Sequence, residues 1–242
     1  MDNTTYISLS RQTTAFRNMD VIANNIANAD TTGYRAQSMV FNPYNYKLNA
    51  SGSKGAWVQD ISTTTNTAQG AMTTTGRQLD VAINGEGYFA VNTPLGIRYT
   101  RAGNFTRGDD GRILTPEGYE VQGEGGQAIT LQDTDTDITV HEDGTVTSNA
   151  DNGERGKFAI FRFDNPQLLK KFGNGFYTAS TPGQLDEESR VAQGVLEKSN
   201  VQPVVELTRM MQVERSVTST AKLMSDVHDL QIKSITTLTR QQ

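Results

Sequence analysis

The chain has 242 residues and a formal net charge of −5, with 22 basic and 27 acidic side chains. These charges are interleaved, so there is no basic stripe for a nucleic acid, and no apolar run approaches the roughly 20 residues of a membrane span. The absence of cysteine excludes disulfides and thiolate metal sites. Hydrophobic residues make up only 35% of the chain, which is lean for one compact globule and favours backbone lying at subunit interfaces.

The N-terminal segment, from about residue 4 to residue 28, has the apolar spacing of an amphipathic helix. Its apolar residues recur at intervals of 7, 3, 4 and 3, and Ile22 widens the stripe. These residues are Leu9, Phe16, Met19, Ala23 and Ile26. Turn-forming residues at 30–33 predict the end of the helix near Asn28. The first residues carry no basic region, so we expect no cleavable secretory signal.

Residues 35–77 show neither a strand period nor a helix period for long. The stretches at 42–46 and 50–55 are rich in Asn, Gly, Ser and Pro, which is typical of loops. A long irregular segment is unusual in a compact monomer. We therefore expect an extended arm that lies on neighbouring subunits.

From Gln78 onward the pattern is that of a β domain, which we place at residues 78–185. Short alternating apolar runs are separated by glycine-containing turns, and this spacing predicts an antiparallel β-sandwich or open barrel. We expect a helical turn at 165–172, followed by a return segment at 186–202. The expected strands are 79–83, 88–91, 97–99, 113–114, 119–122, 128–131, 138–141, 145–148 and 157–163.

A second amphipathic helix is predicted from about residue 204 to residue 238, and Pro203 suits its first turn. Its stripe follows the same rhythm and consists of Met210, Val213, Val217, Thr220, Met224, Val227 and Leu238, with Leu223, Leu230, Ile232 and Ile235 alongside. An isolated amphipathic helix is marginal in water. We therefore expect the two terminal helices to pair with each other, with copies from other chains, or both. The second helix would be about 50 Å long, so part of its stripe needs another chain.

Possible catalytic and metal chemistry is weak in this sequence. Three aspartates alternate as in a calcium loop, but the sixth and twelfth positions of an EF-hand are occupied by Ile138 and Gly144. The glycine-rich turns lack the following helix N-terminus that cradles a phosphate. We predict no metal, no cofactor, no small-molecule substrate and no enzymatic activity. The aspartates are Asp133, Asp135 and Asp137.

Four blocks of the sequence resemble the bacterial flagellar rod and hook protein family. They are NNIANADTTGY at 24–34, GRQLDVAINGEGYFAV at 76–91, YTRAGNF at 99–105 and GVLEKSNV at 194–201. Four ordered blocks spread over nearly the whole chain make a specific match. The compact length and the opening YISLSRQ at 6–12 look most like the proximal-rod members of that family, rather than the longer distal-rod or hook members.

The resemblance implies a structural subunit of the basal-body rod, a helical shaft that transmits torque from motor to hook. Its fold would be α+β, with both terminal helices in a coiled-coil assembly domain and a mainly antiparallel β domain inserted between them. Its partners would be copies of itself, other flagellar rod proteins and, during secretion, the flagellar export apparatus. It would lie in the periplasm after export without a cleavable signal peptide. The assembly domain would comprise residues 1–34 and 203–242.

The expected assembly interface combines both helical stripes with the first sequence block. The amides of Asn24, Asn25 and Asn28 can hydrogen-bond backbone at subunit junctions, as the resemblance implies. Alternatively, both helices fold onto their own β domain, which periodicity alone does not exclude. The interface residues are Leu9, Phe16, Met19, Ile22, Ala23, Asn24, Asn25, Ile26, Asn28, Gly33, Tyr34, Leu207, Met210, Val213, Val217, Met224, Val227 and Leu238.

Two alternative functions remain open from the sequence. One is a distal-rod or hook-type subunit of the same family. The other, from a different class, is a secreted carbohydrate-binding or hydrolytic β domain with helical appendages. Paired carboxylates lining a cleft would favour the second, but the best pair, Glu117 and Glu120, lies only three residues apart on an expected strand or turn.

Overall fold

A computed structural model describes residues 3–47, 54–149 and 153–240 and divides the chain into two compact units. The chain passes from one unit to the other after Ala27, Ala36, Thr65 and Val201. Each unit is therefore built from segments that are distant in the sequence. Unit 1 comprises Met1–Ala27, Gln37–Thr65 and Gln202–Gln242, and unit 2 comprises Asn28–Ala36 and Asn66–Val201.

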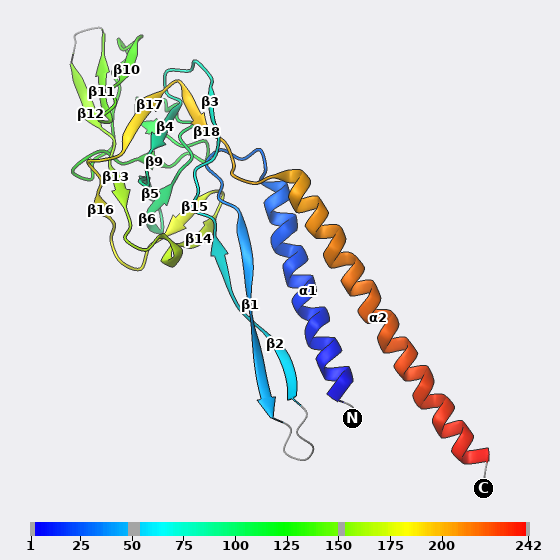
Figure 1. The fold of residues 1–242 in the computed structure, drawn as a ribbon. Helices are drawn as coiled ribbons and strands as arrows, with labels where there is room; N and C mark the ends of the chain where they lie inside the picture. Colours follow the sequence, from blue (N-terminus) through cyan, green and yellow to red (C-terminus); the bar gives the residue numbers. More distant parts are fainter. Residues whose placement is uncertain (1–2, 48–53, 150–152, 241–242) are drawn as a thin grey trace. The chain divides into compact units, whose positions relative to one another are not determined.

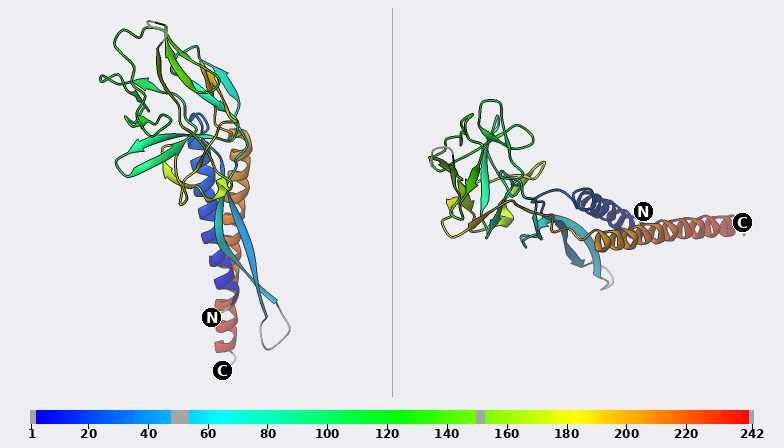
Figure 2. Two further views of the ribbon diagram at one scale, coloured as in Figure 1. Left: turned by 90° about the vertical axis from the view of Figure 1, so that its left-hand side faces the viewer. Right: turned by 90° about the horizontal axis from the view of Figure 1, so that it is seen from above.

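Two long helices form much of unit 1. Helix α1 spans Asn3–Ala27 and helix α2 spans Pro203–Arg240, close to the ranges predicted from apolar spacing. Within this unit the helices lie side by side and run in opposite directions (Figure 1), and two further views show the same pairing (Figure 2). Glu206 lies in the first turn of α2, where a carboxylate favours the positive end of the helix dipole.

Unit 1 also contains two long antiparallel strands, β1 at Gln37–Lys47 and β2 at Lys54–Thr65. The expectation that residues 37–47 and 54–65 lack regular structure, with a loop at 42–46, is therefore wrong, whereas the loop expected at 50–55 lies mostly outside the described residues. The ladder is made by main-chain hydrogen bonds, which do not require alternating apolar side chains. A bulge between Val40 and Phe41 interrupts the register and adds to the irregular appearance of the sequence.

Unit 2 is built around one large antiparallel sheet with the order β14-β15-β6-β5-β9-β8-β7, and β13 joins β5 to β16. Most of its strands are short and are separated by glycine-containing turns, as the sequence predicts. The strands are β5 Tyr88–Thr93, β6 Gly96–Thr100, β7 Thr106–Arg107, β8 Ile113–Leu114, β9 Glu120–Val121, β13 Ile160–Arg162, β14 Lys170–Gly173, β15 Phe176–Thr178 and β16 Gln184–Leu185.

Three smaller antiparallel sheets complete unit 2. One contains β10, β11 and β12, and the other two join late strands to early ones, β17 to β4 and β18 to β3. These pairings are antiparallel, so the predicted α+β class with mainly antiparallel sheets is confirmed. The strands are β3 Met72–Thr74, β4 Val81–Asn84, β10 Ile138–Val140, β11 Thr145–Ser148, β12 Glu154–Lys157, β17 Arg190–Gln193 and β18 Val195–Glu197.

Two strand predictions in unit 2 are wrong in detail. Residues 128–131 form only isolated bridges, with Ala128 opposite Gln122 and Thr130 opposite Arg112. Residues 157–163 do not form one strand, because the chain leaves the sheet of β12 and enters that of β13 between Lys157 and Ile160. The expected helical turn is present as a short 3-10 helix, η1 at Pro166–Leu168, and β14 follows it.

The main hydrophobic core belongs to unit 2. Phe89 lies at its centre and contacts the rings of Phe105 and Phe158 edge-on, with centroids 5.1 and 5.6 Å apart. Edge-to-face rings add stability beyond the burial of their area. The cluster contains Val81, Ile83, Phe89, Val91, Phe105, Ile113, Val121, Ile129, Leu131, Ile138, Val140, Val146, Phe158, Ile160, Phe176 and Val191.

Candidate assembly interface and the junction of the four sequence blocks

The stripe expected on α2 coincides with its least exposed residues. Between residues 207 and 230 the partly buried positions of α2 recur at intervals of 3 and 4, and the others are exposed. This rhythm is that of an a/d seam. The partly buried positions are Met210, Val213, Val217, Thr220, Met224 and Val227. Leu238 lies in α2, but its side chain is outside the described residues.

The stripe on α1 divides into two faces. Ile22 is 4% exposed, and Met19 and Ile26 are partly buried. By contrast, Leu9 and Phe16 are 52% and 49% exposed. Ala23, seven residues beyond Phe16, is exposed as well. One face of α1 therefore packs inside unit 1, while an apolar row at heptad spacing remains open.

The first turns of α2 carry a second open apolar row. Val204, Leu207 and Met211 follow one another at intervals of 3 and 4 and are 76%, 49% and 50% exposed. Leu223 and Leu230, one heptad apart, are also exposed. We call the row of α1 (Leu9, Phe16, Ala23) and the row of α2 (Val204, Leu207, Met211) the open rows of unit 1. A groove of about 320 Å³ between α1, β1 and α2 is lined by Arg11, Thr14, Ala15, Asn18, Phe41, Val213 and Ser216.

Asn25 joins three elements of unit 1. Its side-chain amide donates to the Gln37 carbonyl at 2.7 Å, and its Oδ1 accepts from the Gln37 N–H at 2.9 Å. Its Nδ2 also lies 3.4 Å from Glu206 Oε2, and Arg209 donates to the other oxygen of Glu206 at 2.6 Å. The buried Asn25 side chain thus pairs with β1 like a neighbouring strand and reaches the first turn of α2.

The other two asparagines of the first block bond locally. Asn24 donates to the Asp20 carbonyl within α1 at 2.8 Å. The Oδ1 atom of Asn28, in unit 2, accepts from the Thr31 hydroxyl at 3.2 Å. These contacts stabilise the helix and the turn that follows it.

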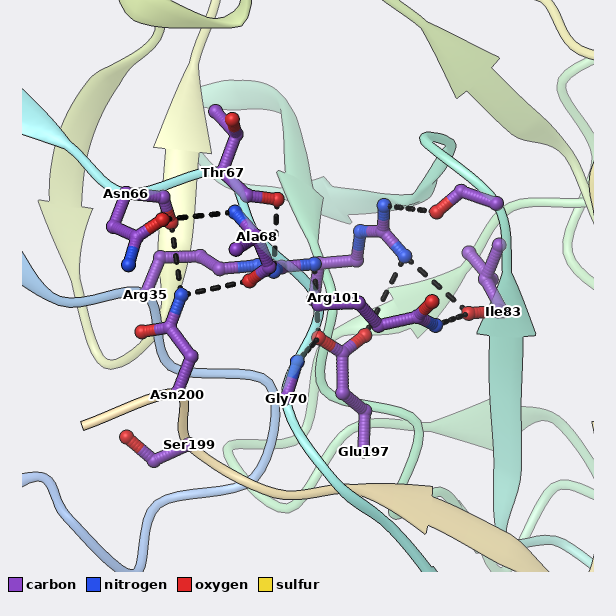
Figure 3. Close-up of polar contacts among 12 residues, drawn as sticks. Arg35, Asn66, Thr67, Ala68, Gly70, Ile83, Arg101, Glu197, Ser199 and Asn200 are labelled. Atoms are coloured by element: carbon purple, nitrogen blue, oxygen red, sulfur yellow. Dashed lines mark hydrogen bonds and ion pairs between the residues drawn. The ribbon is translucent and has the colours of Figure 1, made fainter. Parts of the chain in front are cut away.

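In unit 2 the four sequence blocks meet at a buried carboxylate (Figure 3). Glu197, from the last block, accepts from Arg35 Nη2 at 2.8 Å through Oε1 and from Arg101 Nη1 at 3.4 Å through Oε2. Arg35 directly follows the first block and Arg101 belongs to the third. The exposed fractions of the Arg35, Arg101 and Glu197 side chains are 1%, 3% and 1%.

Main-chain carbonyls accept further hydrogen bonds from the two guanidinium groups of this junction. Arg101 donates to the carbonyls of Gly85 at 2.6 Å and Ile83 at 3.4 Å, both in the second block. Arg35 donates to the carbonyls of Thr67, at 3.0 Å, and Ala68. Two buried guanidinium groups thus share one carboxylate, and main-chain carbonyls supply further acceptors, while Arg35 Nε and Arg101 Nε are buried without a hydrogen-bond partner among the described residues. Burial lowers the pKa of Arg101, and the negative charge of Glu197 opposes that shift.

Asn200, three residues after Glu197, extends the junction. Its Nδ2 donates to the carbonyls of Asn66 at 3.0 Å and Ala68 at 2.7 Å, while its Oδ1 accepts from the Ala36 N–H at 2.7 Å. A main-chain hydrogen bond joins two of the same segments, since the Asn200 N–H donates to the Tyr34 carbonyl at 3.2 Å. One amide side chain therefore connects three segments of unit 2.

Gly33 fits this junction because it lacks a side chain. Its φ is +67°, and a Cβ atom there would lie 2.5 Å from both the Ala102 nitrogen and the Arg101 carbonyl carbon. The next residue, Tyr34, is buried, and Lys171 Nζ lies 3.6 Å from the centroid of its ring. Burial lowers the pKa of Lys171 to about 8. Gly33 and Tyr34, the last two residues of the first sequence block, are thus both closely packed within unit 2.

Three of the carboxylates considered for other chemistry lie in ion pairs, and one of them, Asp135, pairs with Arg155. Asp133 pairs with Arg107, and Glu120 pairs with Arg112 on a neighbouring part of the sheet. Across the described ranges, no group of three or more His, Asp or Glu residues is placed to hold a metal ion. No helix within the same ranges is long and apolar enough to cross a membrane.

The residues predicted from the sequence do not include those that form the buried ion pairs of Glu197 with Arg35 and Arg101 in unit 2. Arg101, Glu197 and Asn200 stand inside the recognised blocks, but periodicity does not single them out, and Arg35 lies one residue beyond the first block. The available signal was a charged residue among small and apolar neighbours in a strand region. Such a residue is either solvated at an edge or paired when buried.

Three protein families match the chain. "Flagella basal body rod protein" matches residues 6–35, "Flagellar hook protein FlgE/F/G D1 domain" matches 82–148, and "Flagellar basal body rod FlgEFG protein C-terminal" matches 192–237. The three matches follow one another along the chain and overlap all four recognised blocks.

Curated relatives align over nearly the full length. The chain is 39% identical to the flagellar basal-body rod protein FlgF of Caulobacter vibrioides, with 95% of each chain covered. It is 34% identical to FlgF of Mesorhizobium japonicum, with 98% of each chain covered. It is 32% identical to the flagellar basal-body rod protein FlgG of Bacillus subtilis, covering 86% of this chain and 88% of the relative.

Proposed function

The chain belongs to the flagellar basal-body rod protein family and is a structural subunit of the rod; from that premise we propose that it builds the proximal part of the rod, as a segment of a helical shaft that transmits torque from motor to hook. The rod is part of the basal body and assembles from several components of this family. The proposed work of the chain is mechanical and lies in its interfaces, with no catalytic residue.

The observation that carries this proposal is the pair of open rows in unit 1. A monomer that exposes two apolar rows at heptad spacing leaves apolar area in water, and each buried CH₂ group contributes about 0.8 kcal/mol. The open rows lie on the helices that already pack on each other, so a neighbouring chain can extend the same packing. We assign coiled-coil assembly to α1 and α2, with Leu9, Phe16, Ala23 and Leu207 as exposed apolar members of the interface named from the sequence.

Export and location follow the same premise. We propose that the chain reaches the periplasm through the flagellar export apparatus without a cleavable signal peptide. The helices of unit 1 would complete their packing on arrival, against copies of the chain and other rod proteins. Burial of the open rows would then favour the assembled state.

Disulfide cross-linking tests the assembly face, because the chain has no native cysteine. Phe16→Cys and Met211→Cys are placed on separate gene copies and expressed together, and isolated basal bodies are oxidised. Each cysteine then belongs to a different subunit, so a dimer band that needs both variants reports contact between chains. The matched controls are Arg17→Cys and Gln212→Cys, which are exposed positions one residue beyond Phe16 and Met211.

The expected result is a dimer that forms with the Phe16 and Met211 positions and is reduced severalfold with the control positions. A disulfide to another rod protein that has been given a cysteine on its own terminal helix, in place of the dimer, would assign the open row to that protein and would overturn contact between copies. A uniformly monomeric chain in intact basal bodies would contradict the assembly role of these rows. Absence of the chain from basal bodies would contradict the rod function itself.

A further inference from the structure

Three segments at the margin of unit 2 are fastened together by two side chains. Residues 33–36, 66–70 and 197–200 are distant in the sequence but meet around Glu197 and Asn200 (Figure 3). These segments adjoin the points where the chain leaves unit 2 after Ala36, re-enters it at Asn66, and leaves it again after Val201. Any force carried along the chain at these points passes through the three segments.

Both oxygens of Glu197 are engaged, so its orientation is fixed. Oε1 accepts from Arg35 Nη2 at 2.8 Å and from the Gly70 N–H at 3.0 Å, while Oε2 faces Arg101 Nη1 at 3.4 Å. The Glu197 carbonyl also accepts from the Gly33 N–H at 2.8 Å. Glu197 therefore bonds to both other segments, through its side chain and its backbone.

Arg101 supports Glu197 from the opposite side. Its guanidinium is anchored to the carbonyls of Ile83 and Gly85, at the end of β4 and in the turn that follows. Its contact with the carboxylate fixes an oxygen different from the one that Arg35 uses. The Arg101 guanidinium can thus affect residues 33–36 by holding Glu197 in place.

We propose that Glu197 and Asn200 form a charge-selective clamp on residues 33–36 and 66–70, and that Arg101 is the positioning residue that holds Glu197 for Arg35. Glu197 is the last residue of β18, which pairs with β3, so the clamp is attached to this two-stranded sheet. The segment before β1 is then fastened by a strand from the far end of the chain. The clamp keeps the entry and exit points of unit 2 together whether or not unit 1 is assembled.

The charges of the clamp predict an ordered set of effects. Two guanidinium groups face one carboxylate, so removal of Arg35 leaves a balanced pair of Arg101 and Glu197. Removal of the Glu197 charge instead leaves two buried cations side by side without their anion, which is strongly unfavourable. Variants of Arg35 should therefore loosen residues 33–36 selectively, and Glu197→Gln should destabilise unit 2 as a whole.

Hydrogen exchange followed by mass spectrometry on the purified full-length chain tests the clamp. In Arg35→Gln we expect the amides of residues 33–36 to exchange at least tenfold faster, with unchanged protection at 81–91. Arg35→Lys should restore part of the protection, because it keeps the positive charge. Arg101→Gln must also accelerate amide exchange at 33–36. Arg101 contacts Glu197 Oε2 and not Oε1, so this effect would arise because Glu197 is no longer held in place for Arg35.

Arg155→Gln is the matched control, because Arg155 makes a buried ion pair with Asp135 elsewhere in unit 2. It should leave exchange at 33–36 as slow as in the unchanged chain. If Arg155→Gln accelerates amide exchange at 33–36 as much as Arg35→Gln does, the effect reflects the stability of unit 2 as a whole, and the clamp is overturned. Slow exchange at 33–36 in Arg101→Gln would overturn the positioning role. If Glu197→Gln does not fold, the Arg35 and Arg101 variants still decide the question, since each leaves one balanced pair.

Discussion

Arg155 donates two parallel hydrogen bonds to Asp135, from Nε to Oδ2 at 2.7 Å and from Nη2 to Oδ1 at 2.8 Å, and both side chains are almost fully buried. This two-point contact joins β12 to the turn before β10. The Gln132 N–H adds a third donor to the carboxylate at 2.8 Å. A carboxylate that receives several charge-assisted and main-chain bonds is strongly favoured in its ionised form.

The first prediction concerns the loss of folding stability at acid pH. The hydrogen bonds from Arg155 hold the pKa of Asp135 well below its usual range. A carboxyl whose folded pKa is depressed stabilises the fold above its unfolded pKa of about 3.9, and this contribution is lost as pH falls toward the folded pKa. Asp135→Asn should lower the free energy of unfolding most at pH 6–7 and least at the lowest pH at which the fold survives. Urea unfolding across that pH range measures the difference in free energy of unfolding between the unchanged chain and the variant. A difference that does not change with pH would contradict the role of the charge.

The second prediction isolates the close approach at Gly33. Gly33→Ala combines a positive φ with a Cβ placed 2.5 Å from backbone atoms of residues 101 and 102, so backbone must shift. Gly118 is the control, because its φ is +86° and its Cβ would meet no atom within 4 Å. Gly118→Ala should cost about 1 kcal/mol, the usual penalty for left-handed backbone, and Gly33→Ala clearly more. Equal urea midpoints for the two variants would show that the approach at Gly33 imposes no added cost.

The third prediction addresses the partly buried row of α2. Val217→Asp places a charge in the contact between helices and should cost roughly 1–3 kcal/mol, the scale for a polar group buried without a partner. We expect cells that carry it to make the protein but lose motility. Thr218→Asp, one residue further on an exposed position, should remain motile. An equally motile Val217→Asp strain would show that this face of α2 points to water.

How far the sequence predicts this molecule differs from one element to another. The α2 stripe was visible because Met210, Val213 and Val217 repeat with the helix period, and burial follows that period. The β1–β2 ladder was hidden because main-chain pairing leaves no apolar alternation. The junction was hidden for a different reason: Arg35 and Glu197 are 162 residues apart, and only the folded sheets bring them to 2.8 Å.

The last prediction concerns the order of folding and assembly. The core clusters of buried apolar residues lie in unit 2, whereas α1 and α2 contribute Ile22 and a row of partly buried side chains. A long helix with one apolar face is marginal in water without a partner. In a purified monomer we therefore expect fast amide exchange in α1 and α2 and slow exchange within residues 81–160. Sedimentation must establish that the sample is monomeric.

In assembled rods the same amides should become protected, because neighbouring chains cover the open rows. Folding of the terminal helices is then coupled to polymerisation, which limits premature assembly before export. Strong protection of α1 and α2 in a demonstrated monomer would refute this coupling. It would show that the contacts inside unit 1, with Asn25 bridging β1 and α2, already hold the helices without a second chain.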